Sequence, residues 1–237
     1  GQTSEKKERI KDFIERLVPK HVTQQLNSAD GSIGSEYKNV TLLYADIVGF
    51  TAYCSGRNTK EVFQMLSRLF TAFDKECNAL ELYKVYTIGD CYVVMSFLDA
   101  HKRYEPEEEA ADVVEFGFSM IEIIAKVRKE VNFDGLHMRI GIHTGKIYGG
   151  IVGTDIIRFD MYGSDVLIAN KLESSGAQDK IHISQATKDL LDLANQDKRY
   201  RFTPDHVLTF NKFTPAREIM TYFIDRNVND EIGRAHV

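Results

Sequence analysis

The sequence predicts an α+β fold in which a ferredoxin-like βαββαβ core is followed by extra strands and helices. The first observation is a set of short runs rich in β-branched and aromatic residues, which are typical of strands. The second is a pair of longer stretches whose apolar residues recur three and four positions apart, as on one face of a helix. In chain order these segments are strand, helix, strand, strand, helix and strand, which is the order of the split βαβ arrangement.

The composition limits the kind of protein. The chain has 237 residues, of which 43% are hydrophobic, so we expect one domain with a sizeable core. The net charge of −5 gives no basic patch, and we expect no binding to nucleic acid. Cys54, Cys77 and Cys91 are too few and too irregularly spaced for a disulfide framework or a cysteine-based zinc site, and they fit a reducing compartment.

The sequence carries no recognisable targeting or membrane segment. The longest apolar runs fall far short of the ~20 residues that a membrane helix requires, and no signal peptide is visible. We therefore expect a cytoplasmic domain, which missing parts of a longer protein could attach to a membrane. Three parts are expected: an N-terminal helix and linker over residues 1–35, the folded domain over 36–226, and a tail over 227–237 that derives in part from an expression vector.

The first elements can be placed from periodicity and turn residues. An amphipathic helix is expected over residues 5–26, stopped or bent at Pro19, and a loop rich in Ser, Gly and Asp over 27–35. The core then begins with a strand. Its first elements are a strand over 40–47, a helix over 59–80 capped by Asn58 or Thr59, and a hairpin over 84–94 that turns at Gly89 and Asp90.

The second half of the core follows the same rules. A long helix is expected over residues 107–131, and then a hairpin that turns at Thr144 and Gly145 between runs 137–143 and 146–152. The remaining elements are a helix over 166–175, a strand over 180–184, a helix over 185–193 and a last hairpin that ends near Ile224.

Two acidic residues stand where strands end. Asp46 closes the first strand, and Asp90 lies in the turn of the first hairpin. If the strand pairs beside the hairpin, the two carboxylates converge, and a divalent cation is the commonest way to stabilise such a pair. The alternative is that they are two unrelated turn aspartates, because Asp caps turns in many proteins.

Four segments resemble the catalytic domains of class III adenylyl and guanylyl cyclases. They are residues 45–51 (ADIVGFT), 87–92 (TIGDCY), 139–145 (RIGIHTG) and 159–163 (FDMYG) with its continuation to 170. The resemblance runs from about residue 40 to 224, with all blocks in the order of the family. It implies the class III nucleotidyl cyclase fold and a lyase that converts ATP or GTP to cyclic AMP or cyclic GMP and pyrophosphate.

The resemblance also implies a set of site residues. In the reaction, the ribose 3′-oxygen attacks the α-phosphate and pyrophosphate leaves. Two divalent cations, Mg²⁺ or Mn²⁺, can activate the attacking oxygen and neutralise the leaving group. The family implies Asp46 and Asp90 as the catalytic carboxylates that bridge these metals, with the backbone carbonyl of Ile47 as an added metal ligand.

Further residues are implied around the triphosphate. Gly49, Phe50 and Thr51 follow the first aspartate where a chain entering a helix could expose N–H groups to the phosphates, although helix entry and packing explain them equally well. Gly89 is assigned to the same nucleotide site. Lys146 stands where the metal-bearing half of the family often has an arginine on the phosphates, and it keeps the charge but loses the bidentate fork. Taken alone, Lys146 would be a surface lysine.

Class III sites form between two such domains, so the residues that read the base and stabilise the transition state must also be sought. Family members that carry the transition-state pair have an asparagine and, four residues on, an arginine, where this chain has Leu167 and Lys171. The first base-reading position, a glutamate in guanylyl and a lysine in adenylyl cyclases, is Tyr86. The second is Asp160, as in adenylyl cyclases, but without the lysine companion. The pattern is similar to the first, metal-binding half of two-half cyclases, which large protist and animal membrane cyclases contain.

We therefore interpret the chain as a cyclase domain that supplies the metal-binding half of a shared site, in a heterodimer with a complementary domain or in a weak homodimer. Its substrate would be a nucleoside triphosphate, ATP or GTP, because the missing partner would read the base. The alternative is a catalytically silent regulatory or dimerisation module, against which the retention of Asp46 and Asp90 argues. A diguanylate cyclase or polymerase-palm relative is a third interpretation, disfavoured because the sequence lacks a Gly-Gly-Asp-Glu-Phe type of hairpin.

Overall fold

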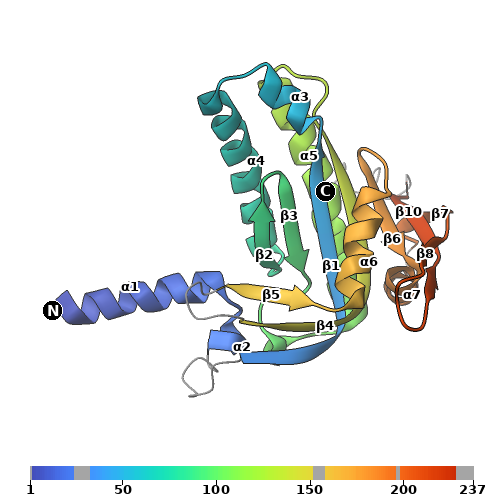
Figure 1. The fold of residues 1–237 in the computed structure, drawn as a ribbon, viewed down its shortest axis with the longest axis horizontal. Helices are drawn as coiled ribbons and strands as arrows, with labels where there is room; N and C mark the ends of the chain where they lie inside the picture. The colour runs from blue at the N-terminus through green and yellow to red at the C-terminus, as the bar shows by residue number, and fades with distance from the viewer. Residues whose placement is uncertain (1, 24–32, 152–157, 196–197, 228–237) are drawn as a thin grey trace.

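The computed structural model describes residues 2–23, 33–151, 158–195 and 198–227. It contains one eight-stranded sheet with helices on both faces and a separate two-stranded sheet near the C-terminus (Figure 1). Helix α1 projects away from the rest of the molecule (Figure 1). Within the described residues, none of the helices combines the length and the apolar character needed to cross a bilayer.

The elements and their bounds are as follows. The helices are α1 (Gln2–Leu17), α2 (Lys20–Thr23), α3 (Phe50–Ser55), α4 (Thr59–Ala79), the 3₁₀ helix η2 (Ala100–Lys102), α5 (Pro106–Glu130), α6 (Ser164–Ser174) and α7 (Gln185–Ala194). The strands are β1 (Ile33–Val48), β2 (Tyr83–Ile88), β3 (Cys91–Met95), β4 (His137–Ile151), β5 (Phe159–Tyr162), β6 (Lys180–Ser184), β7 (Tyr200–Pro204), β8 (Leu208–Phe210), β9 (Arg217–Ile219) and β10 (Thr221–Arg226).

The order of the strands confirms the predicted fold class. The main sheet runs β2-β3-β1-β4-β6-β10-β7, and β5 pairs with β4. All of these pairs are antiparallel except β4 with β6. The strands β2-β3-β1-β4, with α4 after β1 and α5 after β3, form the ferredoxin-like βαββαβ core. The later strands β6, β10 and β7 extend that sheet at the β4 edge.

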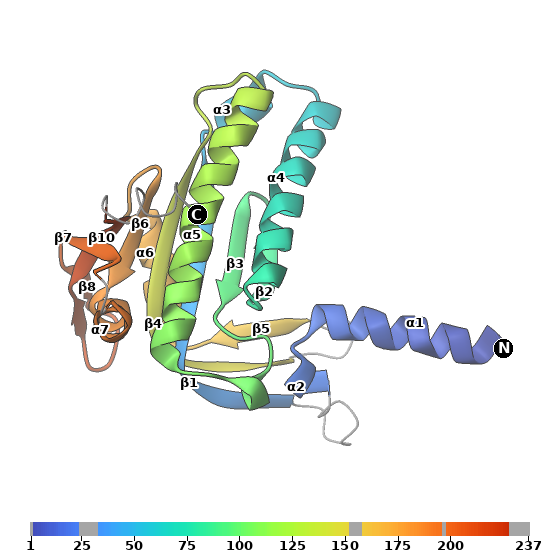
Figure 2. The ribbon, with the colours of Figure 1, turned by 180° about the vertical axis from the view of Figure 1, so that it is seen from behind.

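Helices α4 and α5 lie side by side over one face of the sheet (Figure 2). The core between them and the strands includes Phe73 of α4, Tyr92 of β3 and Phe116 of α5, all fully buried. The ring centroids of Phe73 and Tyr92 are 5.4 Å apart, and those of Tyr92 and Phe116 are 6.0 Å apart. Burial of one such side chain contributes about 1.5–3 kcal/mol, so this face supplies much of the driving force that fixes the strand order.

The opposite face of the sheet is covered by shorter elements. Val22 of α2, Phe159 of β5 and Ala169 of α6 pack there in one apolar cluster. The side chains of Tyr44 and Cys91 belong to the same face. Because side chains alternate along a strand, Asp46 shares this face with Tyr44. The acidic end of β1 therefore lies on the face of the sheet opposite α4 and α5.

The N-terminal helices and the two long helices agree with expectation. The chain breaks at Pro19 between α1 and α2, as predicted, and residues 24–26 of the predicted helix lie outside the described residues. Helix α4 is capped by Asn58, whose side-chain oxygen accepts the N–H of Glu61 at 2.9 Å. Helix α5 spans nearly the predicted residues, with Pro106 at its first turn.

The predicted hairpin at Thr144 and Gly145 is wrong, because β4 continues through both residues as one strand. A Cβ on Gly145 would lie 2.2 Å from the carboxyl carbon of Asp165, and a Cβ on Gly141 would lie 2.1 Å from the backbone nitrogen of Glu173. Both acids belong to α6. The glycines therefore let a helix pack directly on the strand, rather than turning the chain.

Two further expectations need correction. Residues 33–35 were expected in a loop, yet β1 begins at Ile33 because this segment pairs with the last part of β4, from Gly149 to Ile151. The last hairpin is also more elaborate than predicted. Strands β7 and β10 do pair, but their connection holds the separate β8–β9 hairpin, which packs on α6 through Leu208 and Ile219.

Candidate active site

Asp46 and Asp90 come together at one end of the sheet. Asp46 lies near the end of β1, opposite Cys91 of β3 and Arg139 of β4. Asp90 occupies the turn between β2 and β3. Because β3 pairs with β1, this turn brings Asp90 beside Asp46, close enough for Asp90 to raise the pKa of Asp46. The predicted convergence is present, while the role of the pair as metal ligands stays a prediction.

The environment of Asp46 disfavours its ionised form. Burial, the hydrogen bond to Asp90 and the negative charges of Asp90 and Glu173 raise the pKa of Asp46 to about 7. The backbone N–H of Ile47, which donates to Oδ1 of Asp46 at 3.1 Å, opposes this shift only in part. Near neutral pH the carboxyl pair therefore holds a proton. Two adjacent carboxyl groups release such a proton readily to solvent when a divalent cation binds, because the cation removes the repulsion between their charges.

Glu173 is a residue of this site that sequence reasoning missed. It lies on α6, is 5% exposed, and accepts a hydrogen bond from Nε of Arg139 at 2.8 Å. Its ion pair holds the arginine that stands opposite Asp46 in the sheet. Gly141 of β4 marks the point where the backbone of α6 at Glu173 meets the strand, but a glycine in a strand does not by itself show which residue it faces.

Cys91 is a second neighbour that the sequence analysis did not assign to the site. Burial, followed by the charges of Asp46, Glu173 and Asp90, raises the pKa of the Cys91 thiol to about 12. The thiol is therefore neutral and adds no charge to the acidic cluster. Its place opposite Asp46 means that the carboxyl pair is bordered by an apolar group on the β3 side.

The segment after β1 makes a tight turn into α3. Gly49 has a φ of 82°, and a Cβ there would lie 2.2 Å from the carbonyl oxygen of Gly135. Its own carbonyl accepts the N–H of Tyr53 at 2.9 Å, which starts the helix. Phe50 packs against the main core and Thr51 is exposed. These contacts account for Gly49 and Phe50 as helix entry, and their contact with phosphates stays a prediction.

Gly89 and Lys146 lie in different surroundings. Gly89 has a φ of 57° in the turn beside Asp90, with open space where a side chain would stand. Lys146 lies on β4 seven residues beyond Arg139, about 23 Å along the strand, so this chain does not gather it around Asp46. Its ammonium is 4.0 Å from Oε2 of Glu36 and half exposed.

The two predicted base-reading positions do meet, through a residue that the sequence analysis missed. Arg158 forms an ion pair with Asp160 at 3.0 Å, and its guanidinium carbon lies 5.2 Å from the ring centroid of Tyr86. The hydroxyl of Tyr86 is 3.2 Å from that of Tyr44. Burial raises the pKa of Tyr86, so its hydroxyl is neutral. In this chain Tyr86 and Asp160 are thus engaged with internal partners.

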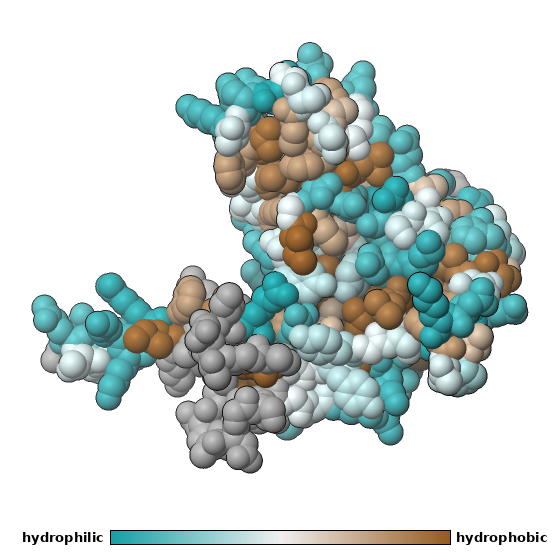
Figure 3. Space-filling view, viewed as in Figure 1, coloured by the Kyte–Doolittle hydropathy of each residue, from teal (hydrophilic) through white to brown (hydrophobic). Residues whose placement is uncertain are grey.

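Leu167 and Lys171 lie on the exposed side of α6. They are four residues apart on α6 and so share one face of the helix, where both are exposed, Leu167 at 56%. Ile88 of the β2–β3 hairpin and Tyr162 of β5 are exposed as well, at 58% and 50%. In Figure 3 hydrophobic and hydrophilic surface alternate over the side of the molecule that bears these elements.

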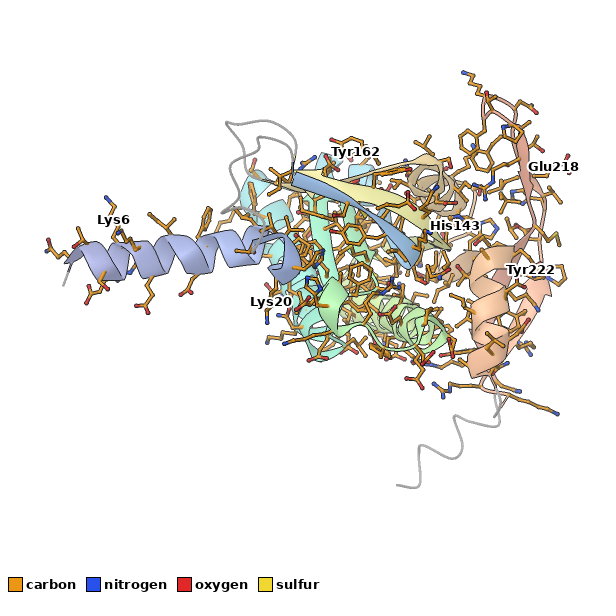
Figure 4. The ribbon with its side chains drawn as sticks, turned by 90° about the horizontal axis from the view of Figure 1, so that it is seen from below. Lys6, Lys20, His143, Tyr162, Glu218 and Tyr222 are labelled. Atoms are coloured by element: carbon orange, nitrogen blue, oxygen red, sulfur yellow. The ribbon has the colours of Figure 1, made fainter. Side chains whose placement is uncertain are left out.

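A buried polar network holds α6 in place beside β4. His143 contacts Oγ of Ser184 through Nδ1 at 2.6 Å and Oδ1 of Asp165 through Nε2 at 2.7 Å, and Figure 4 shows His143 inside the molecule. Although burial alone would raise it, hydrogen bonds from His143 and the backbone of Lys146, with the charges of His143 and Arg217, lower the pKa of Asp165 to about 2. Ser184 is fully buried, so this Ser-His-Asp arrangement is structural rather than nucleophilic.

Taken together, the ferredoxin-like sheet and the carboxyl pair on its face opposite α4 and α5 are the features of a class III nucleotidyl cyclase catalytic domain. Residues 34–226 match the family described as the adenylate and guanylate cyclase catalytic domain. The chain belongs to this family.

Relatives in sequence agree with this assignment. The chain is 36% identical over 198 residues to guanylate cyclase alpha of Plasmodium falciparum, and 38% identical over 187 residues to guanylate cyclase soluble subunit alpha-1 of Canis lupus familiaris. These matches cover 83% and 79% of the chain, but the chain spans only 5% and 26% of the two relatives.

Solved structures share the fold. The guanylate cyclase domain of RhGC from Catenaria anguillulae, in complex with GTP, superposes with a TM-score of 0.69 at 26% identity, covering 81% of this chain and 99% of that one. The adenylyl cyclase CyaB from P. aeruginosa gives a TM-score of 0.72 at 21% identity, covering 83% and 98%, which shows the common fold alone.

Proposed function

We propose that this domain supplies the metal-binding half of a purine nucleotide cyclase site, in which ATP or GTP is converted to the cyclic monophosphate and pyrophosphate. The observation that carries the proposal is the juxtaposition of Asp46 and Asp90 at the end of β1 and the β2–β3 turn, with the pKa of Asp46 raised to about 7. A half-buried acidic pair without a counter-charge is costly, and groups with such perturbed pKa values cluster at functional sites.

The donor set fits divalent cations. Asp46 and Asp90 would hold two cations, Mg²⁺ or Mn²⁺, with the carbonyl of Ile47 as a further oxygen ligand, and hard cations of this kind prefer oxygen ligands. Bound there, the cations would activate the 3′-oxygen of the ribose and neutralise the leaving pyrophosphate. The two groups whose charges act most on Asp46, Asp90 and Glu173, are both negative, which strengthens the attraction for a cation.

The neighbouring residues of the chain would keep this acidic centre in its reactive form. Glu173 holds Arg139 at 2.8 Å, so that the arginine is satisfied by an acid other than Asp46. Gly89 leaves open space beside Asp90 for a phosphate. The N–H of Ile47 orients the carboxyl group of Asp46 by donating to its Oδ1 at 3.1 Å.

The second half of the site would come from a complementary cyclase domain. Leu167 and Lys171 are exposed on α6 and replace the asparagine and arginine of self-sufficient family members. Asp160 is paired with Arg158, and the hydroxyl of Tyr86 contacts that of Tyr44. A partner domain would therefore recognise the base. The relative named soluble subunit alpha-1 is by its name one subunit of an assembly, which supports a shared site. The relatives named guanylate cyclases make GTP the first substrate to test.

A gain-of-function experiment tests the proposal in this chain. The isolated domain should turn over GTP and ATP at background rate with Mn²⁺, because a symmetric dimer would place Leu167 and Lys171 at the transition-state positions. The double substitution Leu167→Asn with Lys171→Arg should raise the rate by about 10²-fold, the usual effect of one preorganised transition-state group.

The control and the contrary outcome are defined by the same assay. Leu167→Ala with Lys171→Ala should leave the rate at background, and Asp46→Asn added to the gain-of-function pair should remove its activity. If the unaltered domain alone were as active as the Asn/Arg variant, the half-site proposal would be wrong. If neither variant had activity and the domain bound no nucleotide with Mn²⁺, the catalytically silent module would be the better interpretation.

A further inference from the structure

A second cluster of potential ligands lies away from the carboxyl pair, where β6 meets the connection between β7 and β8. Nε2 of the His182 ring is 3.0 Å from Oδ2 of Asp205, and Nδ1 of His206 is 2.7 Å from the same oxygen. One ligand atom from each of the three residues lies within 4.8 Å of the other two. None of the three residues contributes to the acidic site or to the network of His143.

The hydrogen bonds of His182 fix which ring nitrogen carries the lone pair. The ring is fully buried, and its Nδ1 is 2.8 Å from the carbonyl oxygen of Leu172. A carbonyl oxygen can only accept, so Nδ1 carries the hydrogen and donates it. In the neutral ring, Nε2 then has a lone pair directed to the side of Asp205. Burial also lowers the pKa of His182, which favours this neutral ring.

Among the residues that the structure describes, no group donates a hydrogen bond to this lone pair. Nε2 of His182 is buried, and its polar neighbour is the carboxylate of Asp205 at 3.0 Å, which as an acceptor cannot satisfy a lone pair. A buried polar atom without a partner costs about 1–3 kcal/mol in proteins, so such an atom calls for an explanation. The lone pair of His182 and the carboxylate oxygen of Asp205 repel each other, and a cation held between them and the imidazole of His206 would remove this repulsion.

We propose that His182, Asp205 and His206 bind a divalent transition-metal ion of the Zn²⁺ class, through Nε2, a carboxylate oxygen and Nδ1. Two imidazoles and one carboxylate with an open fourth position form a donor set that suits zinc, whereas Mg²⁺ prefers oxygen ligands. His206 is half exposed, so the site is reached from solvent on its side. The site therefore differs in ligand chemistry from the all-oxygen pair of Asp46 and Asp90.

The surroundings of the three ligands are already ordered. The hydrogen bond from Nδ1 of His182 to Leu172 is the outer contact that typically fixes the tautomer of a metal-binding histidine. The N–H of Asp205 donates to the carbonyl of Thr221 at 2.9 Å, and the hydroxyl of Thr221 donates to the carbonyl of His206 at 2.5 Å. The backbone that presents both loop ligands is thus held by β10 without the ion.

The ion would connect the C-terminal segment to helix α6. Leu172, the partner of His182, precedes Glu173, which holds Arg139 opposite Asp46. The β8–β9 hairpin that follows His206 packs on the same helix. Occupation of the site should therefore stabilise this end of the sheet, whether or not the domain is a cyclase.

The test is a titration with Co²⁺, in which visible absorption reports tetrahedral nitrogen-containing sites, with excess Mg²⁺ present and with protein that carries no polyhistidine tag. The variant is His206→Ala, and the matched control is His101→Ala, which removes another exposed histidine. The unaltered domain and H101A should bind one Co²⁺ with intense absorption bands. Loss of an outer contact alone costs 10–100-fold in metal affinity, so H206A should bind at least about 100-fold more weakly.

A second variant and a second readout keep the test independent of folding. Asp205→Asn retains the backbone bond to Thr221 and should lose affinity to a similar degree. Zn²⁺ should raise the midpoint of thermal unfolding of the unaltered domain and of H101A, but not of H206A or D205N. The proposal fails if the unaltered domain shows no tetrahedral cobalt bands, or if H206A and D205N bind Co²⁺ as tightly as H101A.

Discussion

Asp46 and Asp165 are both aspartates beside β4, and their pKa values move in opposite directions. Burial, a hydrogen bond to Asp90 and two negative charges raise the pKa of Asp46 to about 7. Asp165 is the more buried, yet hydrogen bonds from His143 and a backbone N–H, with the charge of Arg217, lower its pKa to about 2. The difference shows that hydrogen-bond partners and nearby charges, rather than burial, decide whether the ionised carboxylate is stabilised, as at Asp165, or disfavoured, as at Asp46.

The largest expected effect is on catalysis. Asp46→Asn and Asp90→Asn should each lower cyclase activity by about 10³-fold or more in the assembled enzyme or in the gain-of-function variant, because the metal-dependent stabilisation of the transition state is lost. The rate of cyclic nucleotide formation with Mn²⁺ measures this. Asp192→Asn, which alters an exposed aspartate on α7, is the control and should have no effect. Activity within tenfold of the unaltered protein in either variant would remove the pair from the mechanism.

For stability, the comparison predicts a larger effect of substitution at Asp165 than at Asp46. Asp165→Asn should lower the free energy of unfolding by about 3 kcal/mol, because the amide keeps only one of the two oxygens that accept from His143, Arg217 and the N–H of Lys146, and it loses the charge that pairs with Arg217. Asp46→Asn should leave the stability of the metal-free domain unchanged or raise it, because it removes a repulsive charge. Urea denaturation at pH 7.5 with a chelator measures both. An equal loss in the two variants would show that Asp46 is also a structural acid.

The two aspartates should also give opposite dependences on pH. The folded-state pKa of Asp46 is raised above its unfolded value of about 3.9, so its contribution is fully present below that value and is lost as the pH rises towards 7. For half-buried Asp46 this should amount to about 1 kcal/mol after solvent screening. The contribution of Asp165 is present above about 3.9 and is lost as the pH falls towards 2.

The contribution of Asp46 can be isolated with the metal-free protein. The unaltered domain should lose stability between pH 5 and about 7.5 relative to Asp46→Asn, whereas Asp192→Asn should follow the unaltered domain. Denaturation curves across this range give the comparison. A difference between the unaltered domain and D46N that stayed constant with pH would mean that the pKa of Asp46 is not raised.

The smallest expected effect concerns Glu173. Glu173→Gln removes one of the negative charges that act on Asp46, and it should lower the pKa of Asp46 by less than about one unit. Nuclear magnetic resonance of the labelled carboxyl carbons can follow this titration. Glu122→Gln, which alters an exposed partner of Arg226, is the control. A rise in the pKa of Asp46 in E173Q would contradict the assigned electrostatics.

Local patterns predicted the core of the fold because its elements have strong periodicity and clear ends. The Gly89-Asp90 turn and the end of the first strand predicted that Asp46 and Asp90 converge only if the strand pairs beside the hairpin, and β1 does pair with β3. Gly145 was misread because a glycine that admits a neighbouring helix has the same local signature as one that turns the chain. Only the position of α6, which depends on contacts distant in sequence, separates the two cases.

The remaining site residues were missed for the same reason. Glu173 and Arg158 are far from Asp46 and Tyr86 in the sequence. Glu173 reaches its place because α6 packs on β4, and Arg158 because it precedes β5, which pairs with β4. His182 and His206 are separated by a strand and a helix, without the close spacing that a sequence motif for a metal site would show. Charged residues that meet only through tertiary contacts produce no periodic pattern in the sequence.

The central claim is that the pair of Asp46 and Asp90 holds a proton that a divalent cation displaces. Calorimetric titration of Mn²⁺ at pH 6.5, with a non-cyclising GTP analogue and buffers of different ionisation enthalpy, measures the protons released on binding. The unaltered domain and H206A should each release a large fraction of one proton, and Asp46→Asn should release none. Equal proton release by the unaltered domain and D46N, or undiminished Mn²⁺ binding in D46N, would contradict the account.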